Sequence, residues 1–208
     1  MIHVFHGFLG SPDDFSFLKS ADVVLHDLYE MQTFPAVAEH DILIGYSMGG
    51  RMALELAYNC NFRIKKLILV SAHPGLSNEE ERKNRVTFEA DILFKLKELS
   101  RDQFLSWWNK LPIFSADLPI ESSPERFLQS AELFEKYRLS KQKDFLPLLI
   151  EHKNKILYIT GTQDKKYMEF AENRILPEGL KVKTINGGHR LFQKNTELIK
   201  ILQDEGIL

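Results

Sequence analysis

The sequence predicts an α/β fold in which helices cover both faces of a mostly parallel sheet, and three observations lead to this prediction. Short apolar runs rich in β-branched residues alternate with segments of helical periodicity along the 208-residue chain. Two runs, at residues 67–70 and 156–159, are apolar at consecutive positions, as expected of strands buried on both faces. A third run, at residues 42–44, leads through a glycine-rich turn directly into a helical segment.

The order of the elements follows from these patterns. Strands are expected at residues 2–5, 23–26, 42–44, 66–70, 155–159 and 180–185. Helices are expected at residues 47–58, 165–174 and 192–204, and Ser11-Pro12 has the cap and first-turn proline that start a helix. Strands that alternate with helices form crossover units, so the sheet is predicted to be mostly parallel.

Residues 77–151 interrupt the alternation and are predicted to form one helical insertion between two sheet strands. Its helices are expected at residues 79–99, 101–110, 124–137 and 145–151, with prolines at positions 112, 119 and 124 as breakers. The fold would then consist of a core, residues 1–76 and 152–208, and a lid, residues 77–151, that is not an independent domain. Open parallel sheets bind ligands at the carboxyl ends of their strands, where such an insertion would cover the site.

The composition argues against several classes of protein. A net charge of −2 gives no reason to expect nucleic acid or an anionic membrane surface as a partner. No apolar run approaches the roughly 20 residues of a membrane span. The run at residues 1–5 lacks a basic leader, so we expect no signal peptide and a cytoplasmic location. The single cysteine, Cys60, excludes an intramolecular disulfide and suits a reducing compartment.

The segment Gly45-Tyr46-Ser47-Met48-Gly49 is the pattern G-x-S-x-G between a predicted strand and a predicted helix. In that context the pattern is typical of a nucleophile elbow, a turn so tight that its flanking residues must be small. The serine is then exposed above the edge of the sheet. The alternative interpretation is a glycine-rich turn with an exposed serine of no function.

Two further loops carry the groups that a serine nucleophile needs, a base and a residue that orients the base. Asp164 follows a strand and a glycine in Ile159-Thr-Gly-Thr-Gln-Asp164, and His189 follows the last strand in Ile185-Asn-Gly-Gly-His189. Alone, Asp164 is equally explained as a helix cap and His189 as a loop histidine. Together with Ser47, in the chain order Ser, Asp, His, they predict a catalytic triad.

The segment His6-Gly-Phe-Leu-Gly10 follows the first strand and starts like an oxyanion-donor loop. It predicts that the backbone N–H groups of Phe8 and Met48 converge on a substrate oxygen. The segment is also compatible with an ordinary turn from strand to helix. His6 is expected to support the loop and not to act as a base.

Taken together, these motifs are similar to those of the α/β-hydrolase superfamily throughout the chain. Within it the chain resembles the 2-succinyl-6-hydroxy-2,4-cyclohexadiene-1-carboxylate synthases, lyases of the menaquinone pathway. The narrower resemblance rests on residues 6–10, on Gly45-Tyr-Ser-Met-Gly-Gly-Arg51, on Ser71-Ala-His-Pro-Gly-Leu76 with Arg82 and Arg85, on Trp108 with Pro112-Ile-Phe114, and on Arg138.

The resemblance implies an elimination, in which Ser47, activated by His189, abstracts a proton and pyruvate leaves while Asp164 orients the imidazole. It implies a small acidic substrate and no metal or organic cofactor, and the seven histidines indeed lack metal-ligand spacing. A substrate with several carboxylates needs fixed cations, for which arginine is well suited. The candidate substrate-binding residues are Arg51, Arg82, Arg85 and Arg138, together with Tyr46 and Trp108.

Each arginine could instead be a solvated surface charge, and Tyr46 could simply pack. Arg51 lies one helical turn after Ser47 and therefore shares its face of the helix. The segment at residues 27–41 is shorter than in the resembled family, which trims one flank of the site. The second interpretation is therefore a carboxylesterase or thioesterase that forms an acyl-enzyme on Ser47, and the third is a ligand-binding protein without catalysis. The oligomeric state is not predicted.

Overall fold

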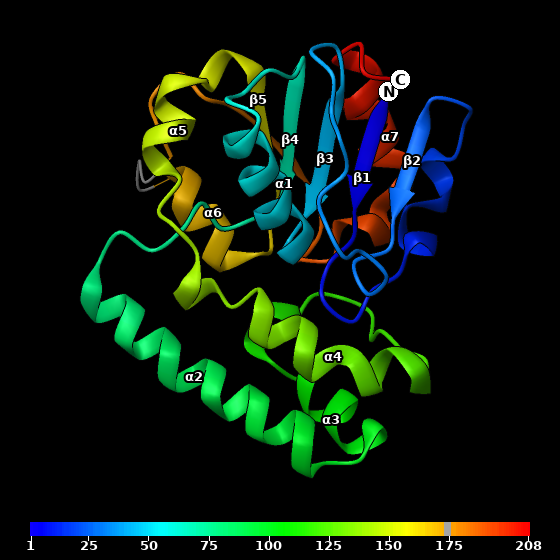
Figure 1. Ribbon diagram of the computed structural model, residues 1–208, viewed down its shortest axis with the longest axis vertical. Coiled ribbons are helices and arrows are strands. Elements are labelled where there is room, and N and C mark those ends of the chain that lie inside the picture. Colours follow the sequence, from blue (N-terminus) through cyan, green and yellow to red (C-terminus); the bar gives the residue numbers. More distant parts are fainter. Residues whose placement is uncertain (173–175) are drawn as a thin grey trace.

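The computed structural model describes residues 1–172 and 176–208 and contains one six-stranded sheet in which all neighbouring strands are parallel (Figure 1). The strand order is β2-β1-β3-β4-β5-β6. The strands are β1 (Ile2–Phe5), β2 (Val23–His26), β3 (Ile42–Tyr46), β4 (Lys66–Val70), β5 (Ile156–Gly161) and β6 (Lys181–Ile185). The six predicted strands and the parallel sheet are confirmed, and β3 and β5 extend further than expected, to Tyr46 and Gly161.

Helices cover both faces of the sheet, which explains why its central strands are apolar at consecutive positions. On β3, Leu43 packs into the cluster beneath α1 (Met48–Asn59), and the next residue, Ile44, packs into the cluster on the opposite face. The opposite cluster is closed by η1 (Pro12–Leu18) and α7 (Asn195–Asp204), through side chains such as Leu198. Both β3 side chains are fully buried, and burying one leucine-sized side chain contributes about 1.5–3 kcal/mol.

The helices at either end of the chain also follow their local signals. Ser11 caps η1 with Pro12 at its first position, as predicted. The expected helix at 192–204 is split into a 3-10 turn, η5 (Leu191–Lys194), and α7. The helix expected at 165–174 is observed as α6 (Lys165–Glu172), and its predicted end at Arg174 lies outside the described residues. None of the described helices is long and apolar enough to cross a membrane.

Between β4 and β5 the chain forms the predicted run of helices, and α2, α3 and α4 lie beyond the carboxyl ends of the strands (Figure 1). This helical segment, residues 77–151, contains α2 (Glu79–Glu98), α3 (Arg101–Trp108), η2 (Pro112–Phe114), α4 (Pro124–Lys136), η3 (Leu139–Lys141) and α5 (Leu146–Glu151); η4 (Lys153–Lys155) leads into β5. Asn78, Ser100 and Ser123 cap α2, α3 and α4 with their side-chain oxygens. Division of the chain into a core and a lid at these boundaries stays a prediction.

A buried carboxylate joins α2 to η3 inside the helical segment. Glu89 is fully buried, and its oxygens accept hydrogen bonds from Arg85 Nε at 2.8 Å, from the Leu139 amide at 2.8 Å and from the Ser140 hydroxyl. A buried charge is tolerated only when its hydrogen-bonding capacity is satisfied, as it is here. Glu89 therefore fixes the distance between α2 and the chain that follows α4.

We expect Glu89→Ala to lower the free energy of unfolding by about 3 kcal/mol, because it leaves the Arg85 charge and two buried donors without their acceptor. Chemical denaturation at equilibrium measures this change. Glu132→Ala, which removes an exposed carboxylate from α4, is the matched control and should change the free energy by less than about 0.5 kcal/mol. Equal effects of the two substitutions would show that the Glu89 network adds no stability.

Candidate active site

The turn between β3 and α1 holds Ser47 in a strained backbone conformation. Its φ of 51° and ψ of −111° lie outside the regions that a side-chain-bearing residue normally occupies. The Ser47 amide donates to the carbonyl of Val70 on β4 at 2.9 Å, which fixes the turn against the sheet. A Cβ atom at Gly45 would lie 2.5 Å from Gly50 Cα, and one at Gly49 would collide with carbonyl oxygens of the loop after β1. The two glycines of the pattern are therefore required by the close approach of three backbone segments.

The side chains of Ser47, His189 and Asp164 form one chain of hydrogen bonds at the carboxyl edge of the sheet. His189 Nε2 lies 3.0 Å from Ser47 Oγ, and His189 Nδ1 lies 2.7 Å from Asp164 Oδ2. His189 and Asp164 are both buried. Because a carboxylate can only accept, Nδ1 carries the proton, and Nε2 is left free to accept the hydroxyl proton of Ser47. This is the geometry that activates a serine oxygen.

The loops that carry these groups are fixed by backbone contacts. The Asp164 Oδ1 atom accepts a hydrogen bond from the Tyr167 amide at 3.4 Å, so Asp164 is also a cap for α6. The His189 and Arg190 amides donate to the two carboxylate oxygens of Asp117, at 3.0 and 3.1 Å. Asp117 comes from the helical segment and was missed in the sequence, because it belongs to no pattern and its partners lie more than 70 positions away.

The loop after β1 holds the backbone around Phe8, whose amide is a predicted oxyanion donor, in a fixed direction. His6 Nδ1 donates to the Gly7 carbonyl at 2.8 Å, and the Gly10 amide donates to the same oxygen at 3.2 Å. In a trans peptide the N–H points away from the C=O, so fixing the Gly7 carbonyl also fixes the direction of the Phe8 N–H. Met48 is the first residue of α1, where the amide has no acceptor within the helix. Both Phe8 and Met48 line the same cavity as Ser47.

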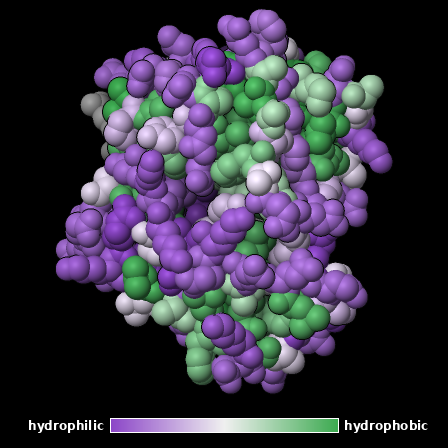
Figure 2. All heavy atoms as spheres, viewed as in Figure 1, coloured by the Kyte–Doolittle hydropathy of each residue, from purple (hydrophilic) through white to green (hydrophobic). Residues whose placement is uncertain are grey.

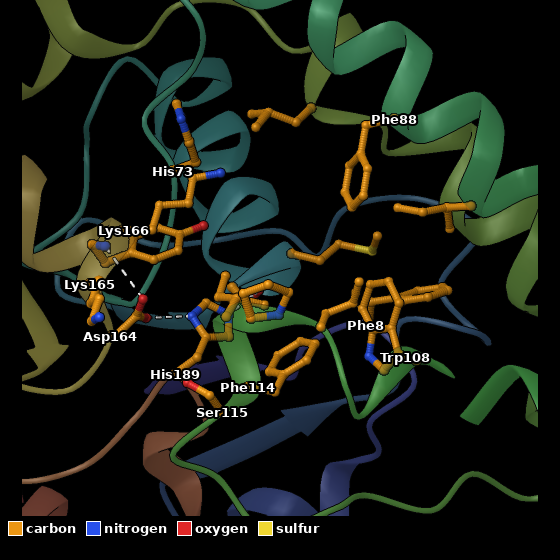
Figure 3. A pocket seen from close by; sticks show the side chains of 18 of the residues that line it. Phe8, His73, Phe88, Trp108, Phe114, Ser115, Asp164, Lys165, Lys166 and His189 are labelled. Carbon is orange, nitrogen blue, oxygen red and sulfur yellow. Dashed lines mark hydrogen bonds and ion pairs between the residues drawn. The ribbon is translucent and has the colours of Figure 1, made fainter. Parts of the chain in front are cut away.

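This cavity has a volume of about 530 Å³ and two chemically different walls (Figure 3). His73, Lys166 and Asp164 lie on one side in the view, and Phe8, Phe88 and Trp108 lie on the other. The polar and charged lining comprises Ser47, Arg51, His73, Arg85, Ser115, Gln163, Asp164, Lys165, Lys166 and His189. The helical segment supplies much of the apolar wall, through Phe88, Ile92, Trp108, Ile113, Phe114 and Phe134.

The recorded hydrogen bonds of Arg51 go to neutral groups. Its Nη1 atom donates to the Tyr137 carbonyl at 2.7 Å and to Gln142 Oε1 at 3.4 Å, and no carboxylate among residues 1–170 and 176–208 forms an ion pair with it. Burial, together with the neighbouring charge of Arg85, lowers the pKa of Arg51 to about 10. The residue therefore stays charged at neutral pH and is available to an anion. Arg85 also lines the cavity, although its Nε is bound to Glu89.

Several polar residues of the cavity were not among the predicted site residues, and two of them, Lys166 and His73, have shifted pKa values. Burial, with the Arg85 charge, lowers the pKa of Lys166 to about 8. Burial also places the pKa of His73 well below its ordinary value, so His73 is neutral, and its Nδ1 accepts from the Gly75 amide at 3.1 Å. The sequence does contain a signal for Lys166, which is the pair Lys165-Lys166 in the first turn of α6. A cation at the start of a helix opposes the helix dipole, so its presence there points to a role other than stabilising the helix.

Of the other predicted binding residues, Trp108 lines the cavity. The remaining three, Arg82, Arg138 and Tyr46, lie elsewhere. The Arg82 guanidinium donates to the carbonyls of Leu76, Ser140 and Gln142, which ties α2 to the chain around it. Neither Arg82 nor Arg138 is among the lining residues.

Arg138 instead pairs with Glu135 at 2.9 Å and lines a neighbouring cavity of about 400 Å³, whose lining also includes Arg51. Tyr46 is buried outside the large cavity and packs against the His189 ring, with 5.4 Å between ring centroids. Arg51, Arg85 and Trp108 are thus the predicted binding residues that reach the space next to Ser47.

Comparison with known proteins gives sequence relatives that include 2-succinyl-6-hydroxy-2,4-cyclohexadiene-1-carboxylate synthases of several bacteria. The chain is 30% identical over 172 residues to the 2-succinyl-6-hydroxy-2,4-cyclohexadiene-1-carboxylate synthase of Photorhabdus laumondii, covering 76% of this chain and 62% of that protein. It is 26% identical over 165 residues to the synthase of the same name from Enterobacter sp. (strain 638), and this match covers 74% of this chain and 61% of that protein. The chain thus spans about three fifths of the length of these relatives. No protein-family model matches it.

Solved structures share the whole fold. MenH from S. aureus has a TM-score of 0.75 at 24% identity and covers 99% of this chain and 94% of its own. A thermophilic esterase from Thermogutta terrifontis, with malate bound, has a TM-score of 0.60 at 20% identity and covers 98% and 88%. An α/β-hydrolase from a deep-sea metagenome has a TM-score of 0.60 at 16% identity and covers 99% of this chain and 89% of its own. The chain therefore has the α/β-hydrolase fold, and its sequence is similar to those of the 2-succinyl-6-hydroxy-2,4-cyclohexadiene-1-carboxylate synthases.

Proposed function

We propose that the chain is a lyase of the menaquinone pathway that eliminates pyruvate from a cyclohexene precursor carrying several carboxylates. One observation carries this proposal: the Ser47–His189–Asp164 chain opens into a cavity whose polar wall is rich in cations, with Arg51, Arg85 and Lys166 among them. An ester of a neutral acid would gain nothing from that wall. The sequence similarity to the synthases points to the same substrate class.

In this mechanism Ser47 is the base, and His189 accepts its hydroxyl proton as the oxygen removes a proton from the substrate carbon next to a carbonyl. Negative charge develops on the carbonyl oxygen, where the Phe8 and Met48 amides stabilise it. The electron pair forms the new ring double bond, and the C–O bond breaks with release of the enolate of pyruvate. Transfer of the proton from His189 to this enolate gives pyruvate and restores the neutral imidazole. Asp164 keeps the imidazole oriented and stabilises its charged form, as in serine hydrolases. No step needs a metal or an organic cofactor.

The helical segment serves as a lid in this proposal. Its side chains Phe88, Trp108 and Phe134 belong to the apolar wall of the cavity. The helices α2, α3 and α4 lie beyond the carboxyl edge of the sheet (Figure 1). An apolar cover keeps water from the cavity, which strengthens the pull of the cations on bound carboxylates.

A carboxylesterase or thioesterase is the second candidate, and the apolar wall together with the esterase among the structural neighbours favours it. In that reaction Ser47 attacks an acyl carbon, and water then releases the acyl group. The two candidates use the same triad and differ in what the cationic wall contributes. Substrate assays, and not the triad geometry, separate them.

Ser47→Ala should reduce pyruvate release from the precursor by about a thousandfold or more, because the base is removed while the cavity remains. A coupled assay that oxidises NADH with released pyruvate measures the rate, and circular dichroism checks the fold. Undiminished release by the variant would refute the triad. Wild-type protein should hydrolyse nitrophenyl esters poorly, and brisk ester turnover without pyruvate release would establish the esterase instead.

Arg51→Lys should lower kcat/KM for the carboxylate substrate about tenfold to a hundredfold, because lysine keeps the charge but loses the planar fork of donors. The same variant should change kcat/KM for a neutral nitrophenyl ester by no more than about twofold. Steady-state kinetics with both substrates provides the comparison. Equal losses on both would mean that Arg51 supports the elbow and does not bind a carboxylate.

Binding of the acidic substrate should weaken as the pH rises through about 8, the pKa of Lys166. A lysine is charged below its pKa, so KM should be lowest below pH 8 and rise above it as the cation is lost. Titration of the triad affects all substrates, so the ratio of kcat/KM for acidic and neutral substrates isolates the effect.

Lys166→Met should abolish the pH dependence of this ratio, whereas Lys83→Met, which removes an exposed lysine from α2, should leave it in place. A ratio that depends on pH equally in both variants would exclude Lys166 as its source.

A further inference from the structure

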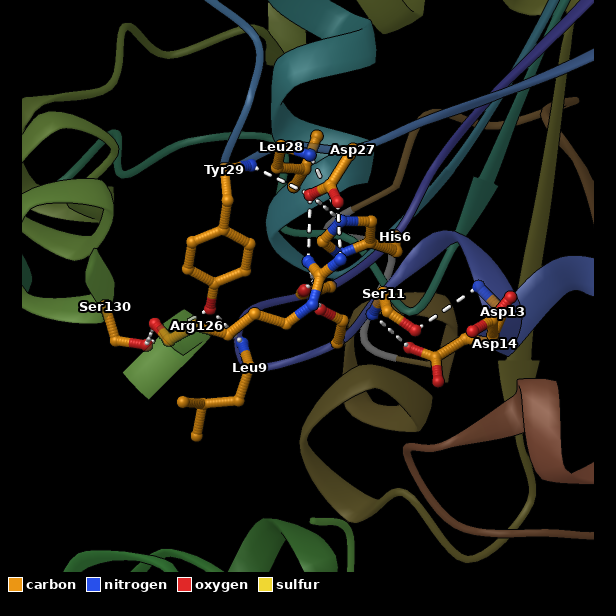
Figure 4. A network of polar contacts seen from close by, with 12 residues as sticks. His6, Leu9, Ser11, Asp13, Asp14, Asp27, Leu28, Tyr29, Arg126 and Ser130 are labelled. Atoms are coloured by element: carbon orange, nitrogen blue, oxygen red, sulfur yellow. Dashed lines mark hydrogen bonds and ion pairs between the residues drawn. The ribbon is translucent and has the colours of Figure 1, made fainter. Parts of the chain in front are cut away.

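A network of polar contacts joins α4 of the helical segment to the loop that carries the Phe8 amide (Figure 4). It is separate from the Ser47–His189–Asp164 chain, and the mechanism above makes no use of it. Its members come from three places: the loop at residues 6–10, the residues that follow β2, and α4.

Arg126 and Asp27 form the centre of this network. Arg126 Nη1 lies 2.8 Å from Asp27 Oδ1, and Arg126 Nη2 contacts Asp27 Oδ2, so the guanidinium binds both carboxylate oxygens. The partners are 99 positions apart and mostly buried, with 25% and 13% of their side-chain surfaces exposed. Arg126 stands in the first turn of α4, where a cation opposes the helix dipole, so its place on the helix is explained by its partner and not by the helix.

The same helix holds the far end of the donor loop. Arg126 Nη1 donates to the Gly10 carbonyl at 3.4 Å. The Tyr29 hydroxyl accepts from the Leu9 amide at 3.2 Å and lies 3.2 Å from the hydroxyl of Ser130 on α4. Leu9 has a φ of 63°, which costs free energy for a residue with a side chain, so contacts from outside the loop must maintain it.

The near end of the loop is held through His6. Its Nδ1 donates to the Gly7 carbonyl, so its Nε2 is an acceptor, and the Leu28 amide donates to it at 3.1 Å. Asp27, the residue before Leu28, therefore anchors the backbone that positions His6, and His6 in turn sets the direction of the Phe8 N–H. Both ends of the donor loop thus depend on groups that the Asp27–Arg126 pair holds in place.

We propose that Arg126 and Asp27 are positioning residues for the Phe8 amide, and that they make this oxyanion donor depend on the seating of α4 against the core. The proposal rests on the proposed function only in assigning the amide to a developing oxyanion, which the lyase and the esterase share. An ordinary surface ion pair would add little stability and would not change turnover.

The test uses Arg126→Gln, Asp27→Asn and the double variant, with the concentration of reactive Ser47 titrated by a fluorophosphonate. The expected kcat per reactive site is about tenfold to a hundredfold below wild type, with KM within about twofold, because the amide acts on the developing charge. The inhibition constant of phenylboronic acid, whose tetrahedral adduct places an oxygen near the amide, should rise by a similar factor. Arg126→Lys should recover only part of the loss, since it lacks the fork.

The double variant separates positioning from stability. Removing both charges leaves no unpaired carboxylate, so the thermal midpoint should recover relative to Arg126→Gln, while kcat per site should stay low. Lys141→Gln, which breaks an ion pair with Glu135 in the same helical segment without touching the donor loop, is the control and should match wild type. Recovery of kcat together with stability, or an unchanged boronate constant in Arg126→Gln, would overturn the proposal.

The readouts also keep the two proposals apart. If wild type releases no pyruvate, kcat is measured on 4-nitrophenyl acetate, and the boronate constant needs no turnover at all. Failure of the lyase assignment therefore leaves the test of Arg126 intact. Normal pyruvate release by all three variants would sink the positioning role alone.

Discussion

The site depends on one close approach of backbone to backbone. Where β3 turns into α1, the chain at Gly49 and Gly50 lies against Gly45 and against the end of β1, with no room for a Cβ at any of these three glycines. This contact raises Ser47 above the sheet and brings the amides of Phe8 and Met48 to the same cavity. Parallel strands then deliver Asp164 and His189 to the same edge, because all their carboxyl ends point one way.

Around that edge, the core and the helical segment contribute different chemistry. The core supplies Arg51 and Lys166 from the first turns of α1 and α6, and the helical segment supplies the apolar wall and Arg85. Hydrophilic residues lie between the two parts on the face seen in Figure 2, in keeping with charged side chains gathered where they meet. Within the part of the chain that the structure describes, the recorded hydrogen bonds of Arg51 go to neutral acceptors, so its charge is poorly compensated there.

Much of this arrangement could be predicted from the sequence. There is a physical reason why the remainder could not. Strands buried on both faces and a glycine turn after each leave local signals, so the sheet, Ser47, Asp164 and His189 could be found from short windows of sequence. Arg82 and Arg85 lie one turn apart on α2 and look alike in the sequence. The position of η3 separates them, because Arg82 donates to a backbone carbonyl of η3 while Arg85 reaches the cavity. Asp117 and Arg126 act through partners that are distant in sequence and that only folding brings near, so the sequence around each of them gives no sign of its role.

The conformation of Ser47 has a consequence for how such a protein changes over time. At a positive φ the backbone of a serine is about 1 kcal/mol less stable than that of a glycine. Stability alone would therefore favour glycine at position 47. The chain instead keeps a hydroxyl on the strained backbone, beside an imidazole that can take its proton. In descendants that are no longer selected for the reaction, we expect an early substitution of Ser47 by glycine, because it relieves the strain of this turn. A glycine at this position would therefore identify a descendant that has kept the fold and lost the reaction.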